Sequence, residues 1–142
     1  PRALDGPLMN ISSFDDLLRA AAAQPQPQRL LFVFAAAGLP DDATPEQRAL
    51  FEAGESGELA PLMCVGKDPH AVTDFDALAL EAATTGADWA LVFAAALGGS
   101  AGLPPSDSLV DAALQRMVES VRSGDLDRLI PFDRQGQAVR LG

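Results

Sequence analysis

The chain has very few of the side chains that most often carry chemistry. Its 142 residues include one cysteine, one histidine and one tryptophan, and no tyrosine. Lysine also occurs once, at Lys67, because the other nine of the ten basic residues are arginines. A single cysteine excludes an internal disulfide framework and is compatible with a reducing cytoplasm. The scarcity of cysteine, histidine, lysine and tyrosine favours a role that does not depend on catalysis.

Long hydrophobic runs and leader segments are also missing. The longest apolar stretch has about ten residues, and a membrane-spanning helix needs about 20. No basic segment followed by an apolar run and a cleavage site opens the chain, so no secretory signal is predicted. We therefore expect a cytoplasmic protein that does not bind a membrane.

Acidic residues outnumber basic ones throughout the chain. Twenty acids against ten bases give a formal net charge of −10, and each half of the sequence contributes 10 acids and 5 bases. Such a surface repels phosphate backbones, and no basic stripe with interleaved aromatic residues compensates for it. We expect no nucleic acid as a partner. A homodimer or a protein partner is compatible with the composition.

Length and composition predict one globular domain. Hydrophobic residues make up 48% of the chain and charged residues 21%, proportions typical of a folded protein. Residues 1–8 show no periodicity, and Met9 stands directly before a helix start. Residues 1–8 are therefore predicted to be a tag remnant or a flexible extension, and residues 9–142 a single domain. No cofactor is expected.

One apolar segment occurs twice in the sequence and predicts the two central strands of a sheet. Residues 30–37 and 90–96 share the sequence Val-Phe-Ala-Ala-Ala, without polar residues at alternate positions. Continuous apolar runs of this kind are typical of strands that helices cover on both faces. The predicted strands are 29–37, 59–65, 88–97, 129–132 and 137–141, with the last two forming a hairpin around a type I turn at 133–136.

Capping residues and apolar stripes predict four helices. The predicted N-caps are Ser12 or Ser13, then Thr44, Thr73 and Ser106. The apolar faces are Phe14, Leu17, Leu18 and Ala21 in the first helix, Phe75, Leu78 and Ala82 in the third, and Leu109, Val110, Ala113, Leu114, Met117, Val118 and Val121 in the last. The helix after Thr44 is expected to be short, because Gly54 and Gly57 end it.

Three landmarks recur in the same order in the two halves of the chain. They are Phe-Asp at 14 and 75, Val-Phe at 33 and 92, and Ser-Gly-acid-Leu at 56 and 123. This order predicts a duplication, with helix-strand-helix-strand repeats at 12–71 and 72–142. The alternative is chance similarity in a chain rich in alanine, leucine and valine. The predicted fold class is α/β: one compact domain whose mainly parallel sheet of four to five strands is flanked by helices and ends in a C-terminal hairpin.

The strongest candidate for a catalytic site is the group of Cys64, Lys67 and His70. The only cysteine, lysine and histidine lie within seven residues, at and just beyond the end of a predicted strand. A thiol near a cation and an imidazole can form a stabilised thiolate, which is a nucleophile. The sequence supplies no third orienting group, and the alternative is a buried strand cysteine followed by a solvated turn. No metal site is predicted, because acids near helix starts are explained by capping.

The glycine-rich loop at 98–102 is a candidate binding site. Gly98, Gly99, Ser100 and Gly102 follow a predicted strand and precede a helix, so their backbone amides could cradle an anion. The loop matches neither of the two common glycine-rich phosphate-binding motifs, and no lysine follows it. A plain connection is the alternative.

Four segments of the chain resemble those of a known family: Phe14–Leu18, Arg29–Phe34, Pro61–Val65 and Pro131–Gly136. They resemble a family of small proteobacterial proteins that are often named "ribonucleotide reductase subunit alpha", and the resemblance covers most of the chain from Met9 onward. A ribonucleotide reductase catalytic subunit works through several cysteines, one of which forms a thiyl radical. This chain has one cysteine and no tyrosine, so it cannot run that reaction alone, and the resemblance implies no site residues.

The sequence therefore favours a non-catalytic, acidic protein that acts by self-association or by association with another protein. One alternative is a protein that binds a small molecule or an anion at 98–102. A second alternative is an enzyme or redox sensor that depends on Cys64.

Overall fold

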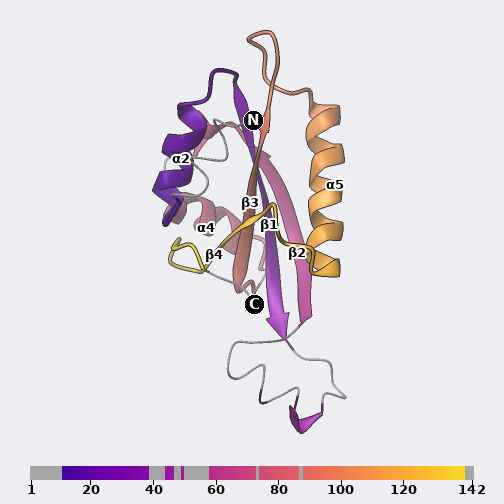
Figure 1. The fold of residues 1–142 in the computed structure, drawn as a ribbon. Helices are drawn as coiled ribbons and strands as arrows, with labels where there is room; N and C mark the ends of the chain where they lie inside the picture. The colour runs from indigo at the N-terminus through magenta and orange to yellow at the C-terminus, as the bar shows by residue number, and fades with distance from the viewer. Residues whose placement is uncertain are drawn as a thin grey trace.

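A four-stranded sheet forms the centre of the protein (Figure 1). The computed structural model describes residues 11–38, 44–46, 49, 58–72, 74–86 and 88–139. The strands are β1 (Gln28–Gly38), β2 (Glu58–Lys67), β3 (Leu91–Gly98) and β4 (Ile130–Phe132). Their order is β2-β1-β3-β4, and each neighbouring pair is antiparallel.

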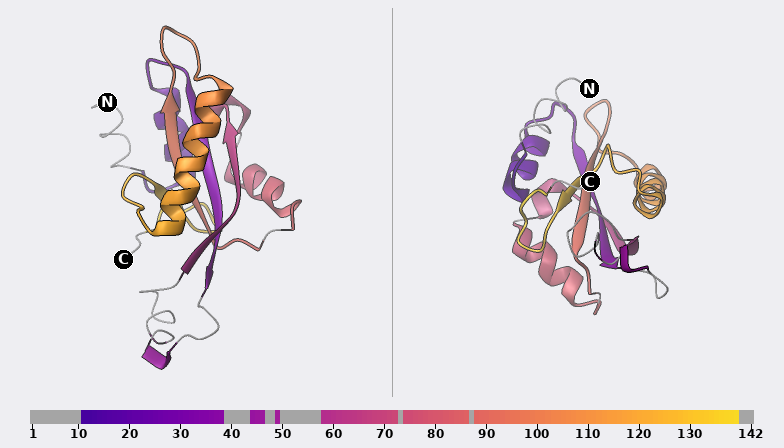
Figure 2. Two further views of the ribbon diagram at one scale, coloured as in Figure 1. Left: turned by 90° about the vertical axis from the view of Figure 1, so that its right-hand side faces the viewer. Right: turned by 60° about the horizontal axis from the view of Figure 1, so that its bottom comes forward.

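Helices cover both faces of this sheet (Figures 1 and 2). The helices α2 (Phe14–Ala22) and α4 (Phe75–Ala83) contribute to the core on one face, and α5 (Asp107–Ser123) covers the other. A short 3-10 helix, η1 (Pro69–Ala71), contacts α2 and β1. The prediction of an α/β fold with one sheet flanked by helices is confirmed. No helix in the described part of the chain has the length and apolar character to cross a membrane.

The central strand β1 is buried on both of its faces, as its continuous apolar sequence predicts. Leu30, Phe32 and Phe34 belong to the core beneath α2 and α4, whereas Leu31 and Val33 belong to the core beneath α5. Successive side chains of a strand point to opposite faces, so an uninterrupted apolar run supplies both cores at once.

The predicted mainly parallel sheet is wrong, because every neighbouring pair of strands is antiparallel. The connection through α4 joins β2 to β3, which lie on either side of β1. These two strands run in the same direction, but β1 separates them and runs the opposite way. Apolar runs report that both faces of a strand are covered and contain no information on the direction of its neighbours.

An aromatic cluster fills the core beneath α2 and α4. The ring of Phe14 lies 5.7 Å from Phe32, 5.3 Å from Phe75 and 5.7 Å from Phe132, measured between centroids. Trp89 meets the ring of Phe34 edge-on at 5.1 Å. Such pairs add about 0.5–1.5 kcal/mol each beyond the burial of their area. The cluster therefore joins both helices to β1 and β4 and to the segment before β3.

Side-chain caps set the starts of α2 and α4. The hydroxyl of Ser13 accepts a hydrogen bond from the Asp16 amide, and the Asp16 carboxylate accepts one from the Ser13 amide, which completes a capping box. The cap of α4 is Asp74, whose carboxylate accepts from the Ala77 amide at 2.8 Å. The predicted cap Thr73 lies outside the described residues.

The helix α5 begins and ends as predicted, but its apolar face is narrower. The hydroxyl of Ser106 caps its first turn, and Gly124, with φ of 81°, ends it. Leu109 was expected on the buried face and is 59% exposed. The buried residues are Val110, Ala113, Leu114, Met117 and Val121. Its neighbour Val110 in the same turn is buried, so Leu109 lies beside the buried face of α5 and not on it.

The predicted duplication is not confirmed. The strand order β2-β1-β3-β4 would suit a twofold axis between β1 and β3. Such an axis is normal to the sheet, so equivalent side chains of the two repeats would lie on the same face. Val33 belongs to the core beneath α5, whereas Val92 belongs to the core beneath α2 and α4. The repeated Val-Phe phrase therefore does not mark equivalent positions.

Three further predictions concern the chain ends and connections. The second strand of the C-terminal hairpin is not confirmed: within 137–139, the described part of that segment, a bridge joins Phe132 to Ala138. The turn forms, with the Gly136 amide donating to the Asp133 carbonyl at 3.1 Å. Residues 1–8 lie outside the described residues. The same holds for most of the helix predicted after Thr44, of which Pro45 and Glu46 are helical.

Candidate functional site at the end of the sheet

Four elements meet at one end of the sheet. At this end β1 and α5 begin, while β2 and β3 end, because β2 and β3 run opposite to β1 (Figure 1). A cavity of about 410 Å³ lies there. It is lined by the end of α2, by residues 24–29, by residues 68–70 and by Pro104. This volume falls within the range of small-molecule sites, about 300–1,000 Å³.

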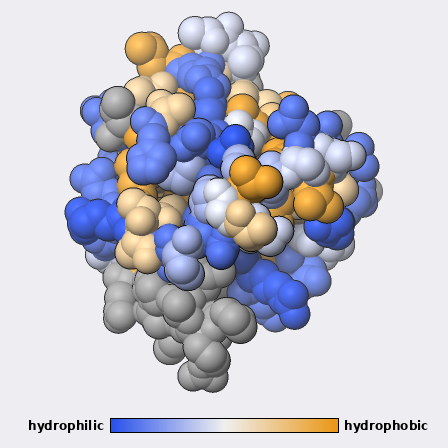
Figure 3. All heavy atoms as spheres, turned by 90° about the horizontal axis from the view of Figure 1, so that it is seen from above, coloured by the Kyte–Doolittle hydropathy of each residue, from blue (hydrophilic) through white to orange (hydrophobic). Residues whose placement is uncertain are grey.

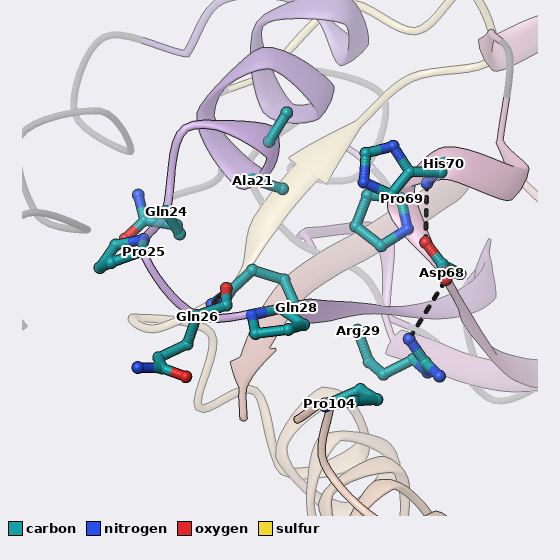
Figure 4. A pocket seen from close by; sticks show the side chains of 12 residues that line it. Ala21, Gln24, Pro25, Gln26, Gln28, Arg29, Asp68, Pro69, His70 and Pro104 are labelled. Atoms are coloured by element: carbon teal, nitrogen blue, oxygen red, sulfur yellow. Dashed lines mark hydrogen bonds and ion pairs between the residues drawn. The ribbon is translucent and has the colours of Figure 1, made fainter. Parts of the chain in front are cut away.

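Asp68 organises one side of this cavity (Figure 4). One of its carboxylate oxygens accepts a hydrogen bond from the backbone amide of His70 at 2.9 Å, and the other lies 3.5 Å from Nη1 of Arg29. The Arg29 side chain is 27% exposed. The turn after β2 thus places a carboxylate that orients the guanidinium, which keeps further N–H donors for other acceptors.

Gln28 is the buried polar residue of the cavity lining. It is 6% exposed, and its Nε2 donates to the carbonyl of Gln26 at 2.9 Å. This bond defines which end of the amide is nitrogen, and it leaves Oε1 buried without a hydrogen-bond partner among the described residues. Leaving a buried acceptor unpaired costs about 1–3 kcal/mol. Native proteins rarely keep such an atom without a reason.

The glycine loop supports the cavity wall but does not form an open anion cradle. The amides of Gly99 and Gly102 donate to the Pro27 carbonyl and to Gln26 Oε1, both at 2.8 Å, and the Ser100 amide donates to the Leu103 carbonyl. These three donors therefore have protein acceptors. The ligand-binding role predicted for Gly98, Gly99, Ser100 and Gly102 stays a prediction.

Two glycines of this loop are explained by close packing. A Cβ atom on Gly98 would lie 3.1 Å from Nε2 of Gln28, so the missing side chain makes room for the buried amide. A Cβ atom on Gly99 would lie 1.8 Å from the carbonyl oxygen of Leu103, which only glycine avoids. Gly98 thus contributes to the cavity indirectly, through Gln28.

The structure does not bring Cys64, Lys67 and His70 together. Cys64 is exposed and pairs with Val33, on the α5 side of the sheet. Lys67, three residues further along the strand, directs its Nζ to Glu81 of α4 at 2.7 Å, on the other side. His70 lies in the cavity lining. The alternative interpretation of Cys64 as a buried strand residue is wrong, because Cys64 is exposed, and a catalytic role for it stays a prediction.

The strand β2 forms an open edge of the sheet. The carbonyl of Ala35 accepts from the Ala90 amide, so this peptide of β1 points towards β3. The direction of the peptide groups alternates from residue to residue along a strand. The peptide group of Phe32 therefore points towards β2, where Phe32 pairs with Val65. The neighbouring Cys64 then directs its N–H and C=O away from β1. No described strand pairs with that outer side.

The opposite edge of the sheet is short and partly covered. The strand β4 has three residues, and the segment after it folds back, with the Val139 amide donating to the Pro131 carbonyl at 3.0 Å. Natural sheets protect their edges by such short strands and coverings. Of the two edges, that of β2 is the one with a long run of backbone groups available for pairing.

The surface at the cavity end shows no single hydrophobic patch. Figure 3 views this end and shows hydrophobic residues in small groups among hydrophilic ones. Two exposed leucines, Leu103 and Leu109, belong to the loop before α5 and to its first turn. Within the described ranges, no three His, Cys, Asp or Glu side chains gather in a way suited to a metal ion.

Sequence reasoning missed the cavity residues Gln28, Arg29 and Asp68. The available signals were the Gln-Pro alternation at 24–28 and the Asp-Pro-His turn at 68–70, both next to predicted strands. They meet only because β1 and β2 are antiparallel, so that the start of one lies beside the end of the other. With a parallel sheet as the expectation, the two segments lie at opposite ends.

Comparisons of the chain with protein-family models, with curated proteins and with solved structures gave no significant match. The resemblance to the small proteobacterial family therefore stays a prediction.

Proposed function

We propose that this acidic protein acts in the cytoplasm by self-association, with the β2 strands of two copies pairing antiparallel to form one continuous sheet. The observation that supports the proposal is the open edge of β2, a ten-residue strand whose outer backbone groups have no strand partner among the described residues. Unpaired edges of this kind are templates for pairing with another chain.

A second copy is the partner that this edge fits best. Two identical strands placed antiparallel about a twofold axis are self-complementary, and twofold dimers are the commonest assemblies of soluble proteins. Residues 62–67 carry one charged side chain, Lys67, in a chain with a net charge of −10. Repulsion between two copies is therefore weaker across this edge than across most of the surface.

Pairing is restricted to the second half of β2. Pro61 has no amide hydrogen to donate, and the register with β1 shifts between Phe34 and Ala35, which leaves Leu62 as an extra residue. The residues available for regular pairing are therefore 62–67, with Cys64 near the centre. A pair this short predicts a weak, concentration-dependent dimer.

The proposal is tested by Cys64→Lys, which places a charged side chain at the centre of the edge. We expect the wild type to approach twice the 14.8 kDa chain mass as concentration rises, and Cys64→Lys to remain a monomer. Light scattering coupled to size-exclusion chromatography measures both.

The matched control is Leu80→Lys, at a residue of α4 that is 69% exposed. It changes the net charge by the same amount away from the edge, so it should dimerise like the wild type. A wild type that stays monomeric at the highest attainable concentration, or a Cys64→Lys variant that dimerises normally, would contradict the proposal.

A further inference from the structure

We infer that the cavity at the end of the sheet binds a small linear zwitterion, with a carboxylate at one end and an N–H donor at the other. The inference is independent of dimer formation, because the cavity residues 24–29 and 68–70 lie outside the paired stretch 62–67. It combines one positioned cation, one unpaired buried acceptor and a lining of which half the residues are alanine or proline.

The guanidinium of Arg29 is the group that would hold the carboxylate. It lines the cavity, and the Asp68 carboxylate holds it through one nitrogen, which leaves donors in the planar fork that matches a second carboxylate. The Asp68 carboxylate keeps its negative charge while it accepts from Arg29 and from the His70 amide. A ligand group with a single negative charge therefore suits this end, because further charge would add to the repulsion from Asp68.

The side-chain oxygen of Gln28 is the group that requires a donor. Its amide nitrogen is committed to Gln26, so the amide cannot turn to present nitrogen instead, and Oε1 has no partner within the described structure. A ligand N–H supplies the missing hydrogen bond. An ammonium group is favoured further by the net charge of −10.

The geometry of β1 separates the Gln28 amide from the Arg29 guanidinium. Gln28 and Arg29 are consecutive in β1, and consecutive side chains leave opposite faces of a strand. In Figure 4 the two side chains point in different directions from adjacent positions. A ligand that meets both is therefore extended, with several bonds between its charged ends. Prolines at 25, 27, 69 and 104 supply apolar lining for the intervening chain.

The probe for this test is 6-aminohexanoate, with two matched analogues. Hexanoate lacks the donor, and 6-aminohexanamide lacks the carboxylate. In ¹H–¹⁵N correlation spectra of the full chain, we expect 6-aminohexanoate to shift the amide signals of His70 and Gly102 saturably, with a Kd of about 1 mM. Each analogue should bind about tenfold more weakly.

Variants assign the two ends of the ligand. Arg29→Met should bind 6-aminohexanoate no more tightly than 6-aminohexanamide, and Gln28→Met should bind it no more tightly than hexanoate. The control Arg116→Met removes the same charge from an exposed position of α5 and should bind like the wild type. If Arg29→Met does not fold, Arg29→Lys keeps the charge without the planar fork and should bind with intermediate affinity.

The inference is overturned if 6-aminohexanoate causes no saturable shift in the wild type at concentrations well above the expected Kd. It is also overturned if the three probes bind equally, or if the Arg29 variants bind like Arg116→Met. None of these outcomes depends on the oligomeric state, so failure of this site and failure of the dimer are separable.

Discussion

At the scale of single residues, Gln28 and Arg29 show how neighbours in the chain take different environments. Gln28 is buried with an unpaired oxygen, and Arg29 is held by Asp68 at the cavity wall. The difference arises from the alternation of the strand and from antiparallel pairing, which brings Asp68 beside the start of β1. Neither residue belongs to a motif, so neither is recognisable from its sequence neighbours alone.

Asp16 gives a prediction on the pH dependence of stability. The backbone amide of Ser12 donates to its Oδ2 at 3.0 Å, as does the Ser12 hydroxyl. These hydrogen bonds, assisted by the charge of Arg19 and the Ser13 amide, hold the pKa of the Asp16 carboxyl below its ordinary value of 3.8. A carboxyl whose pKa is lowered by folding stabilises the fold above its unfolded-state pKa, and this stabilisation is lost as the pH falls through the folded-state pKa.

Asp16→Asn should therefore lower the melting temperature at neutral pH, and its difference from the wild type should shrink as the pH falls below 3.8. Thermal unfolding followed by circular dichroism over a pH series measures the difference. The control is Asp15→Asn, which removes the same charge from the same turn without touching the capping box. An Asp16→Asn effect that is constant across the pH series would contradict the assignment.

At the scale of elements, one glycine sets how closely α5 approaches the edge strand. A Cβ atom on Gly66 would lie 2.8 Å from Cγ1 of Val110, closer than packed side chains tolerate. Because Gly66 has no side chain, α5 can pack closely on β2. Figure 2 shows α5 lying against the sheet. Glycine within a strand often marks such a close approach.

Gly66→Ala should destabilise the protein by about 1–3 kcal/mol, because the added methyl group must displace the Val110 side chain or the helix that carries it. Val110→Ala removes the opposing methyl groups and also destabilises, through lost burial. In the double variant the two changes compensate, so its loss of unfolding free energy should be smaller than the sum by about 1 kcal/mol. Urea denaturation of the four proteins measures this coupling, and strictly additive losses would show that the two residues are not in contact.

At the scale of the whole molecule, net charge opposes the proposed assembly. Each copy carries a formal charge of −10, spread over both halves of the chain. The proposed interface is nearly uncharged, so the repulsion between copies acts across solvent and is screened by salt. The strength of the dimer should therefore depend on ionic strength.

We expect the dimer Kd to fall when salt rises from about 0.01 M to about 0.1 M, over which the Debye length shortens from about 30 to about 10 Å. Sedimentation equilibrium of the wild type measures the change. A Kd that rises with salt would indicate an interface held by ion pairs, which the β2 edge does not provide.

The sequence by itself determined the local structure of most of the described chain. Caps, apolar stripes and apolar runs predicted α2, α5 and the three long strands to within a few residues, because these signals act between residues close in the chain. It also predicted that β1 is covered on both faces. Leu109 departs from the pattern because the packing of α5 on the sheet decides how wide its buried face is.

Tertiary structure alone decided the strand directions, the open edge and the cavity. These depend on which distant segments lie side by side, and the apolar runs of β1 and β3 are compatible with either direction of pairing. The same antiparallel order that places Asp68 beside Arg29 also leaves Cys64 on the outer edge, instead of in the core. Short-range patterns cannot report such neighbours, because their energies are set by contacts that form only once the sheet is assembled.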